Sequence, residues 1–143
     1  MISATFDHSE LNVTNLDDSI NFFSAAFGYE VTFRENGIAK EIATMMGVEN
    51  LTCDLAQMKR QDDGPVLELI HFNVQMSLPE PPTEPIYTRQ GHICFAVTSI
   101  DDAIAEARKL GGKIVGEIAE YPECRACYFQ EPGGSIFELT EYR

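Results

Sequence analysis

Apolar residues recur at intervals of three or four positions in two segments of the chain, and glycine follows both segments. This spacing places the apolar side chains on one face of an α-helix, and glycine favours the left-handed conformation that ends a helix. The first set is Leu16, Ile20, Phe23 and Phe27, before Gly28. The second set is Ile100, Ile104, Ala107 and Leu110, before Gly111 and Gly112. The pattern predicts two amphipathic helices, and we expect Asp17 and Asp101 to help cap their first turns.

Shorter runs with strand character surround the two predicted helices, and turn-forming residues separate them. In the first half the predicted strands are residues 8–13, 29–34, 52–58 and 66–72. In the second half a strand begins at His92, and the others are residues 113–117, 124–130 and 136–142. Residues 61–64 and 131–134 have the composition of hairpin turns. The first half has extra residues, which fit a short helix or loop at 41–48.

An internal repeat relates the two halves. When the chain is shifted by 84 residues, His8 falls on His92, and eight of 24 consecutive pairs are identical. Later in each half Glu68 and Glu138 begin similar tripeptides, now offset by 70. We infer an α+β protein of two tandem β-α-β-β-β modules, residues 1–76 and 87–143, within one domain over 1–143. The four prolines within 77–86 predict a stiff, extended connector.

Composition excludes several classes of function. The chain has 143 residues, with 23 Asp and Glu against 10 Lys and Arg, so its formal charge of −13 would repel nucleic acid. No stretch approaches the roughly 20 apolar residues of a membrane helix, and the N-terminus lacks a signal-peptide pattern. Because four cysteines are dispersed in a chain that is 44% apolar, a cytoplasmic location is expected rather than a disulfide framework.

The repeat places one histidine on the first strand and one glutamate on the last strand of each half: His8, Glu68, His92 and Glu138. Both glutamates interrupt apolar runs, where a carboxylate is costly to bury unless it is paired or bound to a cation. Taken singly, such a glutamate usually faces water and such a histidine is structural. Taken together, they predict one divalent metal site, and these ligand types suit Zn, Ni, Co, Mn or Fe(II).

These motifs also carry a family resemblance. The segments concerned are Phe6-Asp7-His8, Leu16 through Phe23, Phe27-Gly28-Tyr29, Gly91-His92-Ile93-Cys94 and Phe137-Glu138-Leu139. The chain resembles the vicinal oxygen chelate superfamily of glyoxalases, methylmalonyl-CoA epimerases, extradiol dioxygenases and fosfomycin- and bleomycin-resistance proteins. The resemblance implies a curved mixed sheet around a metal-binding cleft. It places the family's metal positions on His8, Glu68, His92 and Glu138, and implies a homodimer.

The resemblance implies a lyase or isomerase of the glyoxalase or epimerase type with a small-molecule substrate. In such enzymes a metal stabilises the enolate or enediolate formed when a proton leaves the carbon beside a carbonyl, and Glu138 is expected to be the catalytic base. An Fe(II) extradiol-type dioxygenase and a small-molecule-sequestering protein of the bleomycin-resistance type are the alternatives. The motifs that mark lactoylglutathione lyases and methylmalonyl-CoA epimerases differ here, so the subfamily stays open.

Other residues are weaker candidates. Arg34 and Arg125 are scarce cations that could bind a carboxylate or phosphate of the substrate, although surface salt bridges are the simpler expectation. His71 lies three residues after Glu68, so strand alternation directs it to the opposite face. Cys124 and Cys127 form a lone C-x-x-C motif, which favours strand packing over metal binding. A loop position makes Glu41 a further acid/base candidate.

Overall fold

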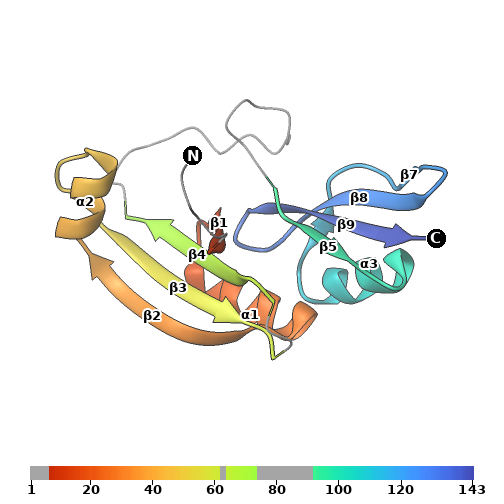
Figure 1. The fold of residues 1–143 in the computed structure, drawn as a ribbon, viewed down its shortest axis with the longest axis horizontal. Coiled ribbons are helices and arrows are strands. Elements are labelled where there is room, and N and C mark those ends of the chain that lie inside the picture. Colours follow the sequence, from red (N-terminus) through yellow and green to blue (C-terminus); the bar gives the residue numbers. More distant parts are fainter. Residues whose placement is uncertain (1–6, 62–63, 74–91) are drawn as a thin grey trace, which may run out of the picture. The chain divides into compact units, whose positions relative to one another are not determined.

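The computed structural model describes residues 7–61, 64–73 and 92–143, which form an α+β fold of two compact units, Met1–Val74 and Gln75–Arg143 (Figure 1). This confirms the predicted fold class. Each unit has its own mixed sheet, so the described strands form two sheets rather than one. The predicted connector at 77–86 lies outside the described residues.

The first unit is a four-stranded sheet with strand order β1-β4-β3-β2. Its elements are β1 (His8–Asn12), α1 (Leu16–Phe27), β2 (Glu30–Ile38), α2 (Lys40–Met46), β3 (Cys53–Lys59) and β4 (Val66–Phe72). Strand β1 runs parallel to β4, and the other neighbours are antiparallel. Helix α1 packs against β3 and β4, so the apolar face of the helix covers the centre of the sheet.

The second unit repeats this plan with strand order β5-β9-β8-β6, and a further short strand, β7, also pairs with β8. Its elements are β5 (Cys94–Ala96), α3 (Ile100–Lys109), β6 (Lys113–Ile114), β7 (Ala119–Glu120), β8 (Cys124–Gln130) and β9 (Ile136–Tyr142). Strand β5 runs parallel to β9, and α3 packs against β6 and β9. The second sheet therefore has the same first-strand and last-strand pairing as the first.

The repeat extends to the register of the paired strands. Glu10 lies opposite Glu68 in the β1–β4 pair, and Cys94 lies opposite Glu138 in the β5–β9 pair. Glu10 and Cys94 are 84 residues apart and Glu68 and Glu138 are 70 apart, which are the two offsets of the internal repeat. The predicted duplication of the β-α-β-β-β fold is thus present in the hydrogen-bonded pairings as well as in the sequence.

Both long helices begin with a side-chain cap that differs from the predicted one. The side chains of Asn15 and Ser99 accept hydrogen bonds from the amides of Asp18 and Asp102, at 3.1 and 3.3 Å. Asp17 and Asp101, which were expected to help cap the helices, lie in the first turns. The cap itself comes from Asn15 and Ser99, which adopt the required extended backbone one position before each helix.

The buried faces of the helices are close to the predicted ones. In α1 the buried residues are Leu16, Ser19, Phe22 and Phe23, and Ile20 and Phe27 are only half-buried. In α3 they are Ile100, Ile104 and Ala107, whereas Leu110 is 37% exposed. The buried stripe of α1 is therefore rotated from the predicted one toward Ser19 and Phe22.

Several strands differ from their predicted bounds. The prediction that a strand begins at His92 is wrong, because β5 begins at Cys94 and His92 lies two residues before it. Strand β2 continues to Ile38 instead of ending at Arg34, because two irregularities in its register with β3 let it bend, and Gly37 adopts a left-handed conformation there. The Gly37 amide donates to the Asp54 carboxylate at 2.7 Å. The predicted strand at 113–117 is shorter: after the Val115 amide donates to the Tyr128 carbonyl oxygen at 3.0 Å the chain bends away, and strand pairing with β8 resumes in β7.

Glycine is needed at Gly112, where the chain leaves α3 close to β8. A Cβ atom at this position would lie 2.3 Å from the ring of Phe129, which is fully buried and cannot move aside freely. The same atom would also approach the carbonyl oxygens of Ala107 and Gln130 at 3.2 Å. The close approach brings α3 onto the sheet whose strand β9 carries Glu138.

Candidate metal-binding pairs

In the first unit His8 and Glu68 lie on the neighbouring strands β1 and β4. The Nε2 atom of His8 is 3.7 Å from Oε1 of Glu68. The Glu68 side chain is only 9% exposed and the His8 side chain 36%. The other ring nitrogen of His8 hydrogen-bonds to the Asp7 carboxylate at 2.7 Å, and that bond raises the pKa of His8. The contact with Asp7 orients the ring so that Nε2 faces Glu68.

Two further polar side chains surround Glu68. Gln57 on β3 donates from Nε2 to Oε2 of Glu68 at 2.8 Å. Glu10 is the β1 partner of Glu68, and burial together with the Glu68 charge raises the pKa of Glu10. Glu10 was not among the residues that the sequence singled out. Its place beside Glu68 became evident from the strand register, which no local pattern reveals.

In the second unit His92 and Glu138 form the equivalent pair. Nε2 of His92 is 2.9 Å from Oε2 of Glu138, and the two side chains are 35% and 24% exposed. Thr140, on the same strand as Glu138, donates to Oε1 of this carboxylate at 3.0 Å. Cys94 lies 3.3 Å from the Thr140 hydroxyl, and burial raises the pKa of this thiol.

An aromatic ring also supports the histidine of the second unit. Tyr128 on β8 lies opposite Glu138 in the β8–β9 register, and its ring meets the His92 ring edge-to-face at a centroid distance of 5.0 Å. Burial is the first cause that raises the pKa of the Tyr128 hydroxyl, and the Glu138 charge adds to it. This contact limits the rotation of the imidazole, so Nε2 keeps facing Glu138.

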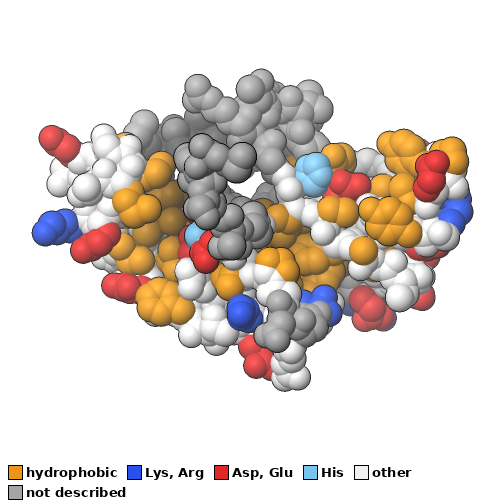
Figure 2. Space-filling model, viewed as in Figure 1, with side chains coloured by type: hydrophobic (Ala, Val, Ile, Leu, Met, Phe, Trp, Pro, Cys, Tyr) orange, Lys and Arg blue, Asp and Glu red, His pale blue; other side chains and the backbone are white. Residues whose placement is uncertain are grey.

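The structure thus places each of the four predicted metal ligands beside a partner in its own unit, His8 with Glu68 and His92 with Glu138. Over residues 7–61, 64–73 and 92–143, no three His, Cys, Asp or Glu side chains form a group that would hold a metal ion. Histidine side chains reach the surface in both units, and acidic side chains predominate over basic ones around them (Figure 2).

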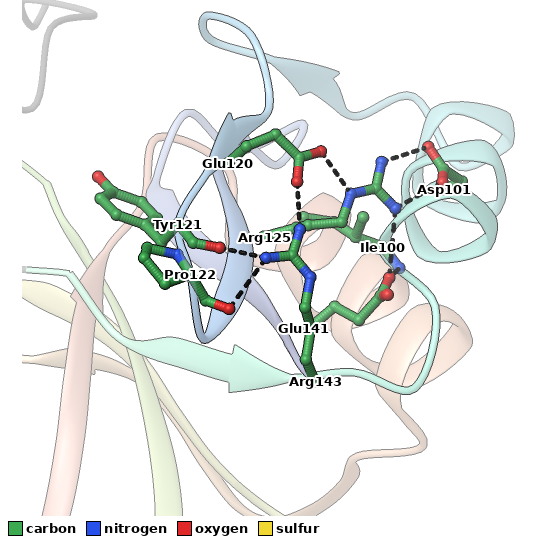
Figure 3. Close-up of polar contacts among 8 residues, drawn as sticks. All are labelled: Ile100, Asp101, Glu120, Tyr121, Pro122, Arg125, Glu141 and Arg143. Carbon is green, nitrogen blue, oxygen red and sulfur yellow. Dashed lines mark hydrogen bonds and ion pairs between the residues drawn. The ribbon is translucent and has the colours of Figure 1, made fainter.

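Both arginines proposed for substrate binding contact acidic side chains near helix starts. Arg34 pairs with Asp17 at 2.6 Å. Arg125 on β8 contacts Asp101 at 2.8 Å, Glu120 at 3.0 Å and Glu141 at 3.5 Å, and Glu120 also contacts Arg143 (Figure 3). The Arg125 network connects α3 to the β7–β8 hairpin and to β9. A role of Arg34 or Arg125 in substrate binding stays a prediction.

Asp101→Asn should make unfolding of the protein less sensitive to acid. The hydrogen bond from Arg125 lowers the pKa of Asp101 below its ordinary value of 3.8, so the carboxylate stabilises the fold fully above that pH. This contribution is lost as the pH falls from 3.8 through the lowered pKa. Urea unfolding of parent and variant should therefore differ at neutral pH and converge in acid. Asp102→Asn, a change in the same helical turn that spares Arg125, should show no such convergence.

The remaining candidates lie apart from the two pairs. His71 is half-buried, and its Nδ1 atom contacts the carbonyl oxygen of Val13 at 2.9 Å. Cys127 is buried, which raises its pKa to about 11, and Cys124 is half-buried on β8, which β9 separates from β5. Glu41 is exposed in the first turn of α2. None of these four residues takes part in the contacts of His8, Glu68, His92 or Glu138 described here.

The family of the chain follows from a comparison with known proteins. The model of the Glyoxalase/Bleomycin resistance protein/Dioxygenase superfamily matches residues 5–139. The chain therefore belongs to this superfamily, as its motifs predicted. No curated protein matches the chain significantly.

Solved structures share the fold over nearly the full chain. A glyoxalase family protein from Bacillus cereus is 24% identical, with a TM-score of 0.82, over 99% of this chain and 96% of its own. The trypanothione-dependent glyoxalase I of Leishmania major is 21% identical, with a TM-score of 0.63, over 97% and 87%. The fosfomycin resistance protein FosX of Listeria monocytogenes, solved with Mn(II) and sulfate, is 20% identical, with a TM-score of 0.62, over 100% and 95%.

Membrane insertion through a helix finds no support in the described part of the chain. None of its helices combines the length and the apolar content that a membrane span requires.

Proposed function

We propose that the chain is a metal-dependent enzyme of the lyase or isomerase type, in which His8, Glu68, His92 and Glu138 bind one divalent ion. The observation that supports this proposal best is the repeated pair: in each unit, a histidine Nε2 atom faces a glutamate oxygen, at 3.7 Å in the first and 2.9 Å in the second. Neutral imidazole and carboxylate together form a donor set for Zn, Ni, Co, Mn or Fe(II). FosX, which shares the fold, was solved with Mn(II).

The local electrostatics of the first unit also favour a cation. Glu68 is almost fully buried, and the exposed Glu10 is its partner across the β1–β4 pair, so two carboxylates lie on neighbouring strands. Two negative charges this close destabilise each other unless a proton or a cation compensates them. A divalent ion bound to Glu68 would supply that compensation, and the His8 ring is already oriented toward the same oxygen.

Glu138 is the better candidate for the catalytic base. Its side chain is 24% exposed against 9% for Glu68, so it is the more accessible to a substrate. The Thr140 hydroxyl donates to Oε1 of Glu138, and Oε2 contacts His92. With His92 bound to the metal instead, Oε2 would be the oxygen that takes the proton from the substrate carbon. A bound divalent ion would stabilise the negative charge that develops on the neighbouring oxygens. His8, Glu68 and His92 would then act mainly as ligands.

The proposal includes a small organic substrate with an acidic proton beside a carbonyl group. Hemithioacetals and acyl-CoA epimers are two classes that meet this requirement, and Leishmania major glyoxalase I is a trypanothione-dependent relative of the same fold. A homodimer in the cytoplasm is part of the same proposal. The acidic surface argues against nucleic acid as a partner.

Removal and restoration of the metal tests this function. Chelation should abolish conversion of the hemithioacetal or acyl-CoA epimer, and adding back Zn, Ni, Co or Mn should restore it. Exchange of the substrate's carbon-bound hydrogen with deuterated solvent should follow the same pattern. Oxygen uptake with catechols that requires Fe(II) would instead favour the dioxygenase, and tight ligand binding without any metal would favour the sequestering protein.

A further inference from the structure

We propose that Gln57 and Thr140 are positioning residues, each of which holds one oxygen of a metal-binding glutamate so that the other oxygen faces the histidine of the same unit. The inference rests on the proposed metal site and goes beyond it, because neither residue is itself a ligand. In both units the glutamate has one oxygen engaged by a neutral side-chain donor and the other directed at histidine Nε2.

In the first unit the donor comes from the neighbouring strand. Gln57 on β3 lies directly opposite Glu68 in the antiparallel register, and its Nε2 atom is 2.8 Å from Oε2. Oε1 is the atom nearest to His8. The backbone carbonyl oxygen of Gln57 also accepts a hydrogen bond from the Thr32 hydroxyl on β2 at 3.1 Å, which fixes the backbone at this point of β3. The amide therefore approaches Glu68 from an anchored position.

In the second unit the donor comes from the same strand as the glutamate. Thr140 is only 3% exposed, and its hydroxyl donates to Oε1 of Glu138 at 3.0 Å. A hydroxyl has a single proton to donate, so its contact with Cys94 at 3.3 Å requires the thiol to be the donor there. The resulting chain from Cys94 through Thr140 to Glu138 leaves Oε2 for His92.

The two donors do not occupy equivalent positions of the repeat. The strand register that pairs Gln57 with Glu68 pairs Tyr128 with Glu138, and Tyr128 contacts the His92 ring instead. Counting from the glutamates, Thr140 corresponds to Ile70, which is buried in the core of the first unit. The carboxylate is thus held in the same way from two positions that the repeat does not relate. If the donors had merely been copied with the duplicated strands, they would occupy equivalent positions, so their different origins indicate that the site itself requires a donor.

Loss of a hydrogen bond to a metal ligand typically lowers metal affinity by about 10–100-fold. We therefore expect Gln57→Met and Thr140→Val each to raise the Kd for Mn(II) by about 10–100-fold. Thr140→Ser keeps the hydroxyl and should stay near the parent value. Thr44→Val serves as the matched control, because it also removes a threonine hydroxyl that is hydrogen-bonded, at 2.7 Å to the Lys40 carbonyl oxygen, but lies on α2 away from the pairs.

The measurement is a titration with Mn(II), in which electron paramagnetic resonance reports the free ion, combined with the melting temperature of each metal-free variant. Weakened binding in Gln57→Met and Thr140→Val, with Thr140→Ser and Thr44→Val unchanged, is the expected result. If Thr140→Val does not fold, the Mn(II) affinity of Gln57→Met alone decides whether the positioning role holds. Variants that bind Mn(II) as tightly as the parent overturn the positioning role alone. A parent that binds neither Mn(II) nor, in the same titration by competition or calorimetry, Zn, Ni, Co or Fe(II) overturns the proposed metal site as well.

Discussion

Glu138→Gln should lower turnover by about 10²–10⁴-fold, the usual contribution of a general base, while the fold is retained. The amide has nearly the shape of the carboxylate, and its oxygen can still accept the hydrogen bond from Thr140. It cannot take a proton from carbon at neutral pH. The loss should therefore appear in the rate of proton exchange from the substrate as well as in net conversion, and thermal unfolding should show that the variant is folded.

Glu68→Gln is the matched comparison for this prediction, since it makes the same chemical change at the equivalent position of the first unit. The Glu68 side chain is less accessible, at 9% exposed, so we expect this variant mainly to lose metal during dialysis and to recover turnover when metal is added back. Full activity in Glu138→Gln would remove Glu138 from the proton transfer. Equal and irreversible losses in both variants would show that the two glutamates share one role as ligands.

His8→Ala and His92→Ala should each weaken binding of the same metal ion more than the loss of a residue that only hydrogen-bonds to a ligand, which costs about 10–100-fold in affinity. Each removes a direct nitrogen ligand, and the two histidines come from different units. His71→Ala is the control, because it deletes the third histidine of the chain, which contacts the Val13 carbonyl oxygen. Calorimetric titration with Zn(II) measures all three variants against the parent.

The outcome distinguishes a shared site from two separate ones. A shared site predicts that each single variant loses the high-affinity event as a whole. Two separate sites predict that each variant keeps half of the binding capacity with unchanged affinity. An effect of His71→Ala as large as that of the other two would mean that the loss reflects the fold and not the ligands.

The sequence was sufficient to predict the elements that determine the two pairs. The spacing of apolar residues, with glycines at its end, located both long helices. The internal repeat matched His8 with His92 and Glu68 with Glu138. The strand register confirms that the repeat also holds in space, since Glu10 and Cys94 lie opposite the two glutamates. These features are visible in the sequence because they depend on spacing, which a chain records directly.

The residues that cap the helices and the burial of Glu131 in a turn are features that the sequence could not predict. Asp17 and Asn15 are both good capping residues, and only the backbone conformation selects Asn15. Glu131 is 2% exposed, yet a glutamate between two strands gives no sign of burial. Its carboxylate accepts hydrogen bonds from the amides of Gly133 and Ser135 at 2.6 and 2.8 Å, which holds the predicted hairpin turn.

The partners of the glutamates were missed for a similar reason. Gln57 and Thr140 belong to ordinary strand sequences, and their importance arises from the strand that happens to lie beside them. A cross-strand contact depends on register, which one sequence constrains only weakly. Thr140 carried no signal of its own, because its strand β9 also contains Glu138 and Glu141.

The metal content of the parent protein tests the central claim most directly. The protein is purified without a histidine tag and without added metal, and elemental analysis is compared with that of the His8→Ala, His92→Ala double variant. The account predicts about one divalent ion per chain in the parent, as one four-ligand site requires, and none in the double variant. A parent that holds no metal, even after reconstitution with Zn, Ni, Co, Mn and Fe(II), would contradict it and favour a binding protein.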